Sequence, residues 1–302
     1  MGVGRSGTTL LVNLMGAHPL LAPIYETPFL RKVLRYCERL SRVSNFSTSR
    51  SLPWLFRLFL KKESGKLRKQ LVNAANNPRD PTTLKQEYEA FPFGLSQCIL
   101  YTPEEVAHET DKWIKTLLKG PLCEQDIYRS ARHYTERLFS IHCARLNKPF
   151  WVNKTPALLN YADRLPKLYP SARYIHILRD GRDAAASLLS LPWGPKTVAK
   201  AARHWRSHVT NGRLKLNASK LPFIELRYKD LVESPESTLE RIFSFLGIEA
   251  DPTQMLETVP VYRTKRETWK SSFSAKDRLI FHREAGDLLI ELGYEDGESW
   301  VR

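Results

Sequence analysis

Ten residues at the amino end of the chain carry groups that could bind an anion. The segment reads Gly2-Val3-Gly4-Arg5-Ser6-Gly7-Thr8-Thr9-Leu10-Leu11. Glycines let backbone N–H groups converge on an anion, and the amino end of a following helix adds positive charge. Threonine hydroxyls can donate hydrogen bonds, and a guanidinium can bind two oxygens of one phosphate or sulfate. The predicted anion-binding residues are Gly4, Arg5, Ser6, Gly7, Thr8 and Thr9. The alternative is a glycine turn in front of a buried helix.

A second group of this kind lies past the middle of the chain. Arg179 follows the strand-like run 173–178, which is rich in β-branched and aromatic residues, and Ser187 follows Arg179 by eight positions. A base at the end of a strand, a turn glycine (Gly181) and a serine in the next helix can together hold a phosphate dianion. The sequence therefore predicts two anion-binding segments that are far apart in the chain and fold together to bind one ligand.

Two single charged residues follow other predicted strands. Glu26 comes shortly after the apolar run 20–24, and Lys154 comes directly after the run 149–153. Ligands of open α/β sheets bind beyond the carboxyl ends of the strands, so both side chains could reach a ligand there. Glu26 could equally cap the next helix, and Lys154 taken alone is best interpreted as a surface lysine.

These residues require an α/β framework to position them. Apolar and polar patterns predict strands at 20–24, 149–153, 173–178 and 221–228. They predict helices at 8–16, 196–214, 231–247 and 274–292. We expect a parallel sheet of about four or five strands, of the P-loop type, flanked by helices. Since Met1 sits almost on the first loop, the strand before that loop is either very short or supplied by residues that precede Met1.

The intervening residues 31–148 are predicted to form a largely helical insert. Helices are expected at 103–117 and 125–146, and Pro53 is a favourable start for another. Residues 54–69 combine apolar and basic side chains, which is typical of a helix that packs one face on its own domain. Such a helix can also lie on a membrane surface or bind an acidic acceptor. Acceptor recognition is expected in this insert.

The first loop resembles the 5′-phosphosulfate loop of sulfotransferases that use 3′-phosphoadenosine-5′-phosphosulfate (PAPS). The resemblance extends over about residues 1–30 and 149–295 and is nearest to tyrosylprotein sulfotransferases and their bacterial-type relatives. The spacing of Gly2 and Gly7 also fits a Walker A motif, but Thr8 stands where that motif needs lysine. The resemblance implies one domain over 1–302, with PAPS as co-substrate and no metal ion.

The resemblance also implies roles for individual residues. Glu26 matches the general base that takes the acceptor proton, and Lys154 matches the lysine beside the leaving phosphate oxygen. Pro28 replaces an arginine of the tyrosine-sulfating enzymes, which weakens the case for peptide tyrosine as the acceptor. The remaining implied roles are Arg5 at the phosphosulfate, Arg179 and Ser187 at the 3′-phosphate, and Tyr228 near the adenine. Lys265 and Arg266 are further candidates for contact with the 3′-phosphate, and the alignment of their segment with the family is left open.

Composition bounds the other functional classes. The 302 residues carry a net charge of +15, which favours anionic ligands, acidic polymers or membrane surfaces. The four cysteines are scattered without metal-ligand spacing, and neither a signal peptide nor an apolar run of membrane-spanning length is visible, so a reduced, cytoplasmic location is expected. The alternatives to a sulfotransferase are a P-loop kinase and a basic binding module. No nucleic-acid motif accompanies the charge, so no nucleic-acid partner is expected. An anionic acceptor is compatible with the net positive charge. The sequence leaves the oligomeric state open.

Overall fold

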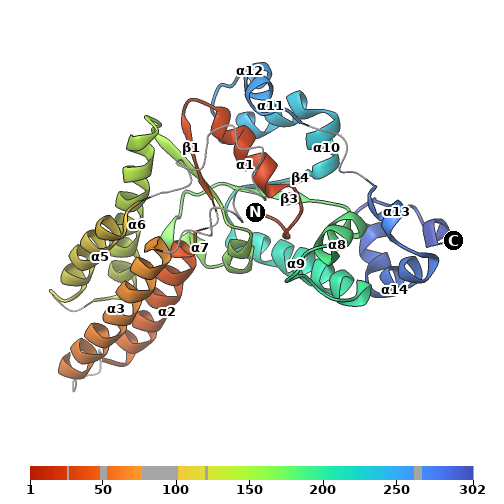
Figure 1. Cartoon of the computed structure of the whole chain (residues 1–302). Helices are drawn as coiled ribbons and strands as arrows, with labels where there is room; N and C mark the ends of the chain where they lie inside the picture. Colours follow the sequence, from red (N-terminus) through yellow and green to blue (C-terminus); the bar gives the residue numbers. More distant parts are fainter. Residues whose placement is uncertain (26, 48–52, 77–100, 120–121, 262–266, 302) are drawn as a thin grey trace. The chain divides into compact units, whose positions relative to one another are not determined.

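The chain divides into two compact units, each with its own core. The computed structural model describes residues 1–25, 27–47, 53–76, 101–119, 122–261 and 267–301 (Figure 1). The first unit comprises Met1–Ala17, Pro156–Asp163 and Ala172–Arg302, and the second comprises His18–Thr155 and Arg164–Ser171. The organisation of residues 1–302 as a single functional domain stays a prediction.

A parallel strand pair lies at the centre of the first unit. Strands β3 (Tyr174–Leu178) and β4 (Phe223–Arg227) pair with Tyr174 opposite Phe223 and Leu178 opposite Arg227. All five residues of β3 are buried, as is usual for parallel strands that are covered on both faces. Met1 lies along β3, because the Ile177 N–H donates to the Met1 carbonyl at 2.9 Å and the Met1 nitrogen donates to the Ile175 carbonyl. The loop at residues 2–7 therefore starts from the sheet.

Helices follow the strands of the first unit and mostly match the prediction. The elements are α1 (Thr8–Ala17), η2 (Pro156–Tyr161), α8 (Gly181–Leu189), α9 (Val198–Ser219), α10 (Tyr228–Glu233), α11 (Pro235–Leu246), α12 (Pro252–Thr258), α13 (Trp269–Ser272), α14 (Ala275–Glu291) and η4 (Ser299–Val301).

The single helix predicted for residues 231–247 is wrong. Ser234 has φ −133° and ψ 62°, and it separates α10 from α11. Proline has no N–H and disfavours helical geometry in the residue before it, so Pro235 ends one helix and occupies the first position of the next.

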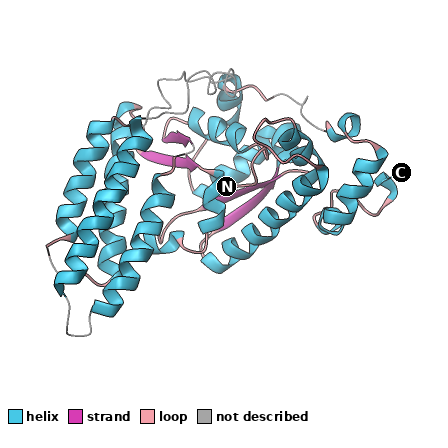
Figure 2. Cartoon of the chain, turned by 60° about the horizontal axis from the view of Figure 1, so that its bottom comes forward, coloured by secondary structure: helices cyan, strands magenta, loops and turns pink. Residues whose placement is uncertain are grey.

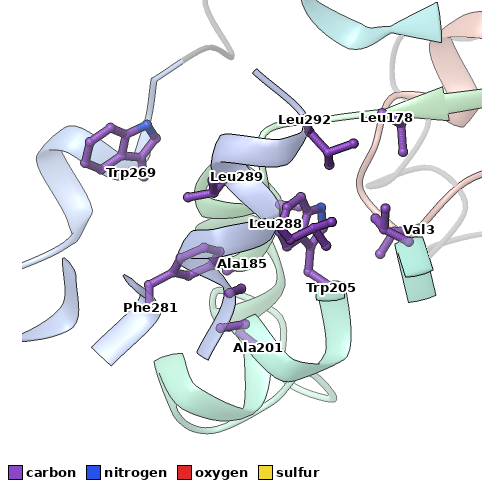
Figure 3. Close-up of a cluster of buried hydrophobic side chains, with 14 of the residues drawn as sticks. Val3, Leu178, Ala185, Ala201, Trp205, Trp269, Phe281, Leu288, Leu289 and Leu292 are labelled. Carbon is purple, nitrogen blue, oxygen red and sulfur yellow. The ribbon is translucent and has the colours of Figure 1, made fainter. Parts of the chain in front are cut away.

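The core of the first unit joins the amino-terminal loop to the carboxyl-terminal helices. Val3, Leu178, Trp205 and Phe281 are between 0% and 3% exposed and belong to one apolar cluster (Figure 3). Figure 3 shows Trp205 beside Leu288, close to the chain that carries Val3. The loop is thus held from beneath by apolar packing, which leaves its polar groups for other contacts.

The second unit contains a four-helix bundle and the other strand pair. Helices α2 (Phe29–Ser47), α3 (Pro53–Asn76), α5 (Pro103–Leu117) and α6 (Glu124–Arg145) pack in a ring in which each contacts two others (Figure 2). Strands β1 (Leu21–Tyr25) and β2 (Phe150–Lys154) pair in parallel, and the short helix α7 (Leu165–Leu168) packs on α6.

The predicted helices 103–117 and 125–146 are confirmed by α5 and α6. Thr102 and Glu105 form a reciprocal capping box at the start of α5, which satisfies backbone N–H groups at that end of the helix. The described residues contain four strands in two parallel pairs, so the predicted α/β class is also confirmed. Within the described part of the chain, no helix combines the length and the apolar character that spanning a membrane requires.

Candidate functional site

The loop between Val3 and α1 adopts a backbone suited to binding an anion. Arg5 and Gly7 have positive φ angles of 69° and 85°, and the Ser6 N–H donates to the Val3 carbonyl at 3.2 Å. The Leu11 N–H is bonded to the Gly7 carbonyl at 3.0 Å, which is the start of helical bonding in α1. By helical geometry, the preceding N–H groups of α1 point out of its amino end, where the helix dipole is positive.

Two hydrogen bonds join this loop to the second predicted anion-binding segment. Arg5 Nε donates to Ser187 Oγ at 3.0 Å, and Arg179 Nη1 donates to the Arg5 carbonyl at 2.9 Å. Ser187 lies on α8, and Arg179 follows β3 directly. Two segments that are more than 170 positions apart in the sequence therefore form one cationic, hydrogen-bonding cluster within the first unit. Its donor groups are guanidinium, hydroxyl and helix N–H groups, which fit an oxyanion.

Tyr228 packs beneath this cluster. The Arg179 guanidinium carbon lies 4.8 Å from the centre of the Tyr228 ring. A Cβ atom added to Gly7 would lie 2.3 Å from a carbon of the same ring, so the ring fills the space that a side chain at Gly7 would need. Tyr228 is 7% exposed, and burial raises the pKa of its hydroxyl. The ring thus packs against both Gly7 of the loop and the Arg179 guanidinium. Contact with an adenine stays a prediction.

Asp183 on α8 binds the carboxyl-terminal segment. Its two carboxylate oxygens accept hydrogen bonds from the Glu267 N–H at 3.0 Å, the Thr268 hydroxyl at 3.0 Å and the Trp269 N–H at 3.2 Å. One of these oxygens also lies 3.9 Å from Arg179 Nη2. Asp183 therefore joins three parts of the chain, a role that was not predicted from the sequence.

Arg182 was also missed. It is 3% exposed and lies 4.0 Å from the ring centre of Trp269 and 4.7 Å from that of Trp300. Its guanidinium donates to both oxygens of Asp180, which caps α8, and to Glu295. Burial raises the pKa of Asp180 despite this partner. The alternation of basic and acidic residues in 179–183 was the available signal, but only Arg179 and the turn at Gly181 were given roles in the predicted anion site.

Of the two candidate residues predicted in the second unit, the structure describes Lys154 but not Glu26. Lys154 ends β2, is 5% exposed, and stands in register with Tyr25 at the end of β1. Thr155 Oγ1 donates to the Thr27 carbonyl at 3.5 Å, so the chain after β2 meets the chain after β1. Glu26, Lys265 and Arg266 lie outside the described residues. The described part of the chain contains no cluster of histidine, cysteine and carboxylate side chains that could bind a metal ion.

Comparison with known proteins gives a consistent result. The sequence model of the Sulfotransferase family matches residues 1–252. Nodulation protein NoeE of Sinorhizobium fredii is 25% identical over 214 residues, which cover 57% of this chain and 51% of NoeE. The chain thus spans about half the length of this curated relative.

A solved sulfotransferase domain has a similar fold. The sulfotransferase domain of the olefin synthase of Synechococcus PCC 7002 aligns with a TM-score of 0.51 at 19% identity, covering 95% of this chain and 92% of that domain. Sulfotransferase STF9 of Mycobacterium avium aligns with a TM-score of 0.49 at 17% identity, covering 98% of this chain and 76% of STF9.

Proposed function

The chain belongs to the Sulfotransferase family, and from that membership we propose that it transfers a sulfuryl group from PAPS to an acceptor hydroxyl and releases 3′,5′-ADP. The acceptor class in this proposal is a hydroxyl compound: a carbohydrate, a lipid, a peptide or a small molecule. The observation that carries the proposal is the pair of hydrogen bonds that joins Arg5 to Ser187 and Arg179 to the Arg5 carbonyl.

This pair of contacts supports PAPS as the donor because PAPS carries two anionic groups on one ribose. The 5′-phosphosulfate and the 3′-phosphate of such a molecule are only a few bonds apart. One protein site must therefore offer two neighbouring sets of donors. The loop with α1 forms one set and Arg179 with Ser187 the other, and the direct Arg5–Ser187 bond shows that the two sets adjoin.

The proposed chemistry needs a base and a cation. PAPS supplies the sulfuryl group. Glu26 accepts the proton of the acceptor hydroxyl, whose oxygen forms the new bond to sulfur while the bond from sulfur to the 5′-phosphate oxygen breaks. Lys154 and Arg5 stabilise the negative charge that develops on that phosphate oxygen. In this proposal the cations of the protein serve the leaving group, so no metal ion has a role.

Ligand-induced stabilisation tests the proposal directly. We expect 3′,5′-ADP, in buffer with a chelator, to raise the melting temperature, since a ligand at about 100 times its Kd adds about 2.7 kcal/mol. Arg179→Ala should abolish this response, whereas Arg129→Ala, at an exposed ion pair of the second unit, should retain it.

Two outcomes would contradict the proposal. Stabilisation by magnesium-ATP and not by 3′,5′-ADP would favour a kinase-like phosphotransferase. A lack of response to either nucleotide, together with steeply salt-dependent binding to DNA, would favour a basic binding module.

A further inference from the structure

Helix α3 buries one face and exposes the other. Leu60, Leu67 and Leu71 are between 0% and 2% exposed and pack inside the second unit. Exposed residues recur on the opposite side at intervals of three and four positions, as expected for one face of a helix. Its members, called here the outer face of α3, are Trp54, Arg57, Leu58, Lys61, Lys62, Gly65, Lys66 and Lys69. The inner face accounts for the packing of α3, so the outer face is available to a partner.

The outer face has a strong positive charge. Helices α2 and α3 together contain eleven lysine and arginine residues and two glutamates. Glu63 is 7% exposed, and its carboxylate is bound at 2.8 Å by both Arg39 and Lys66. Among the described residues, no ion pair forms with Arg57 or with the lysines at 61, 62 and 69. The outer face therefore presents four cations that form no ion pair with the described residues, whereas its fifth cation, Lys66, is paired with Glu63.

Two large apolar side chains interrupt this charge. Trp54 and Leu58 are 57% and 56% exposed and lie one turn apart at the amino end of α3. Lys61 and Lys62 occupy the next turn. Leaving large apolar groups in water is unfavourable, so their position beside lysines points to a surface that offers both an apolar layer and negative charge.

We propose that the outer face of α3 binds the surface of an anionic lipid bilayer, with the helix lying along the membrane plane. Tryptophan favours the headgroup region of a bilayer, and leucine favours the adjoining acyl chains. The lysines then approach anionic headgroups, where each strengthens binding. A purely polar acidic polymer would meet the lysines but would leave Leu58 in water, which is why the bilayer is the better match.

Vesicle flotation tests this proposal without any sulfuryl donor, so its outcome is separate from that of the proposed function. The full chain should float with phosphatidylcholine vesicles that contain phosphatidylserine, and not with phosphatidylcholine alone. Binding should weaken at high salt, because screening shortens the range of the charge attraction. Failure to float with the anionic vesicles would overturn the proposal.

Matched variants separate the outer face from net charge. The triple variant Lys61→Glu, Lys62→Glu and Lys69→Glu should lose at least about 100-fold in affinity, from roughly fivefold per lysine. The control is the triple variant Lys196→Glu, Lys200→Glu and Lys276→Glu, which changes the net charge equally at exposed positions of the first unit. An equal loss in both triple variants would overturn the proposal.

The apolar pair distinguishes a membrane from an anionic polymer. Trp54→Ala with Leu58→Ala should reduce vesicle binding roughly tenfold while leaving retention on a heparin column unchanged. Unchanged vesicle binding in this double variant, or heparin binding without vesicle binding in the natural chain, would contradict the proposal. Thermal melting of each variant checks that the fold is retained, and these side chains are exposed, so we expect little change.

Discussion

Arg5 takes part in the candidate site twice, through its guanidinium and through its backbone carbonyl. The guanidinium donates to Ser187, and the carbonyl accepts from Arg179. Its φ of 69° is unusual for a residue other than glycine and costs conformational energy. The hydrogen bond from Arg179 compensates part of that cost, because the left-handed backbone is what turns the carbonyl toward Arg179. Arg5 therefore fixes the geometry of the loop as well as contributing charge.

Gly7 and Gly4 provide a matched test of the packing between the loop and the Tyr228 ring. In Gly7→Ala the new methyl group would meet the Tyr228 ring and would force a side chain into a positive φ. We expect a loss of about 2–4 kcal/mol in the free energy of unfolding and a smaller melting shift with 3′,5′-ADP. Gly4→Ala is the control, since a Cβ there meets no atom within 4 Å. Equal losses in the two variants, measured by thermal melting, would contradict the described role of Tyr228.

The proposed base is tested at the same scale. Glu26→Gln keeps the shape of the side chain but removes its capacity to accept a proton. We expect turnover of an active acceptor to fall roughly 100- to 10,000-fold while 3′,5′-ADP still raises the melting temperature. Glu257→Gln, on the exposed side of α12, is the control and should retain turnover. Near-normal turnover in Glu26→Gln would remove Glu26 from the mechanism.

At the scale of elements, the sequence predicted what local patterns determine. Apolar and polar patterns located α5, α6 and α14, and apolar runs located the four strands, because these signals act over a few neighbouring residues. The break at Ser234 was missed although Pro235 was visible. The amphipathic period continues through 231–247 and favours one helix, but the local effect of Pro235 on the backbone overrides it.

The pairing of β3 with β4 places His176 opposite Glu225. His176 was predicted to be a core residue, and it is 0% exposed, with Nδ1 at 2.9 Å from a Glu225 oxygen. Burial lowers the pKa of His176, and Arg213 acts in the same direction against the hydrogen bond to Glu225. Burial alone would raise the pKa of Glu225, but hydrogen bonds from His176 and Arg213 outweigh it and lower that pKa.

Acidification should therefore destabilise the first unit. With both pKa values below their unfolded values, the unfolded chain binds more protons, so stability falls as the pH drops below about 6.5 for His176 and further near the glutamate range. His176→Asn retains a polar group beside Glu225 but cannot titrate, so its melting temperature should vary less between about pH 7 and pH 5. His133→Asn, at an exposed position, should follow the natural curve. A curve for His176→Asn as steep as the natural one would refute this account.

At the scale of the whole molecule, the sequence indicated the family but not the contacts that assemble the site. Two anion-binding segments, each with a local signature of glycine, base and hydroxyl, were predicted to come together at one ligand, but the contacts that join them were not predicted. Their junction depends on a side chain that reaches a backbone carbonyl 174 positions away. Asp183 likewise acts on residues more than 80 positions away. No local pattern encodes such pairs, since they arise only after the strands and helices have packed.

The composition gave the net charge of the chain but not the places where that charge is concentrated on the structure. The total of +15 was known from the sequence, yet the concentration of basic residues on α2 and α3 gains meaning only once one face of α3 is seen to be buried. Burial decides which residues of an amphipathic pattern serve the interior and which remain for partners. Both interpretations of residues 54–69 that the sequence left open are thus compatible with one helix.

The bond from Arg179 to the carbonyl of Arg5 has a practical consequence for protein engineering. A peptide that contains only the first thirty residues would lack the group that secures the turn, so transplanting that peptide into another scaffold should not transfer anion affinity. A graft must bring the Arg179 strand end and α8 along with it. The candidate anion-binding element is therefore formed by segments that are not contiguous in the sequence.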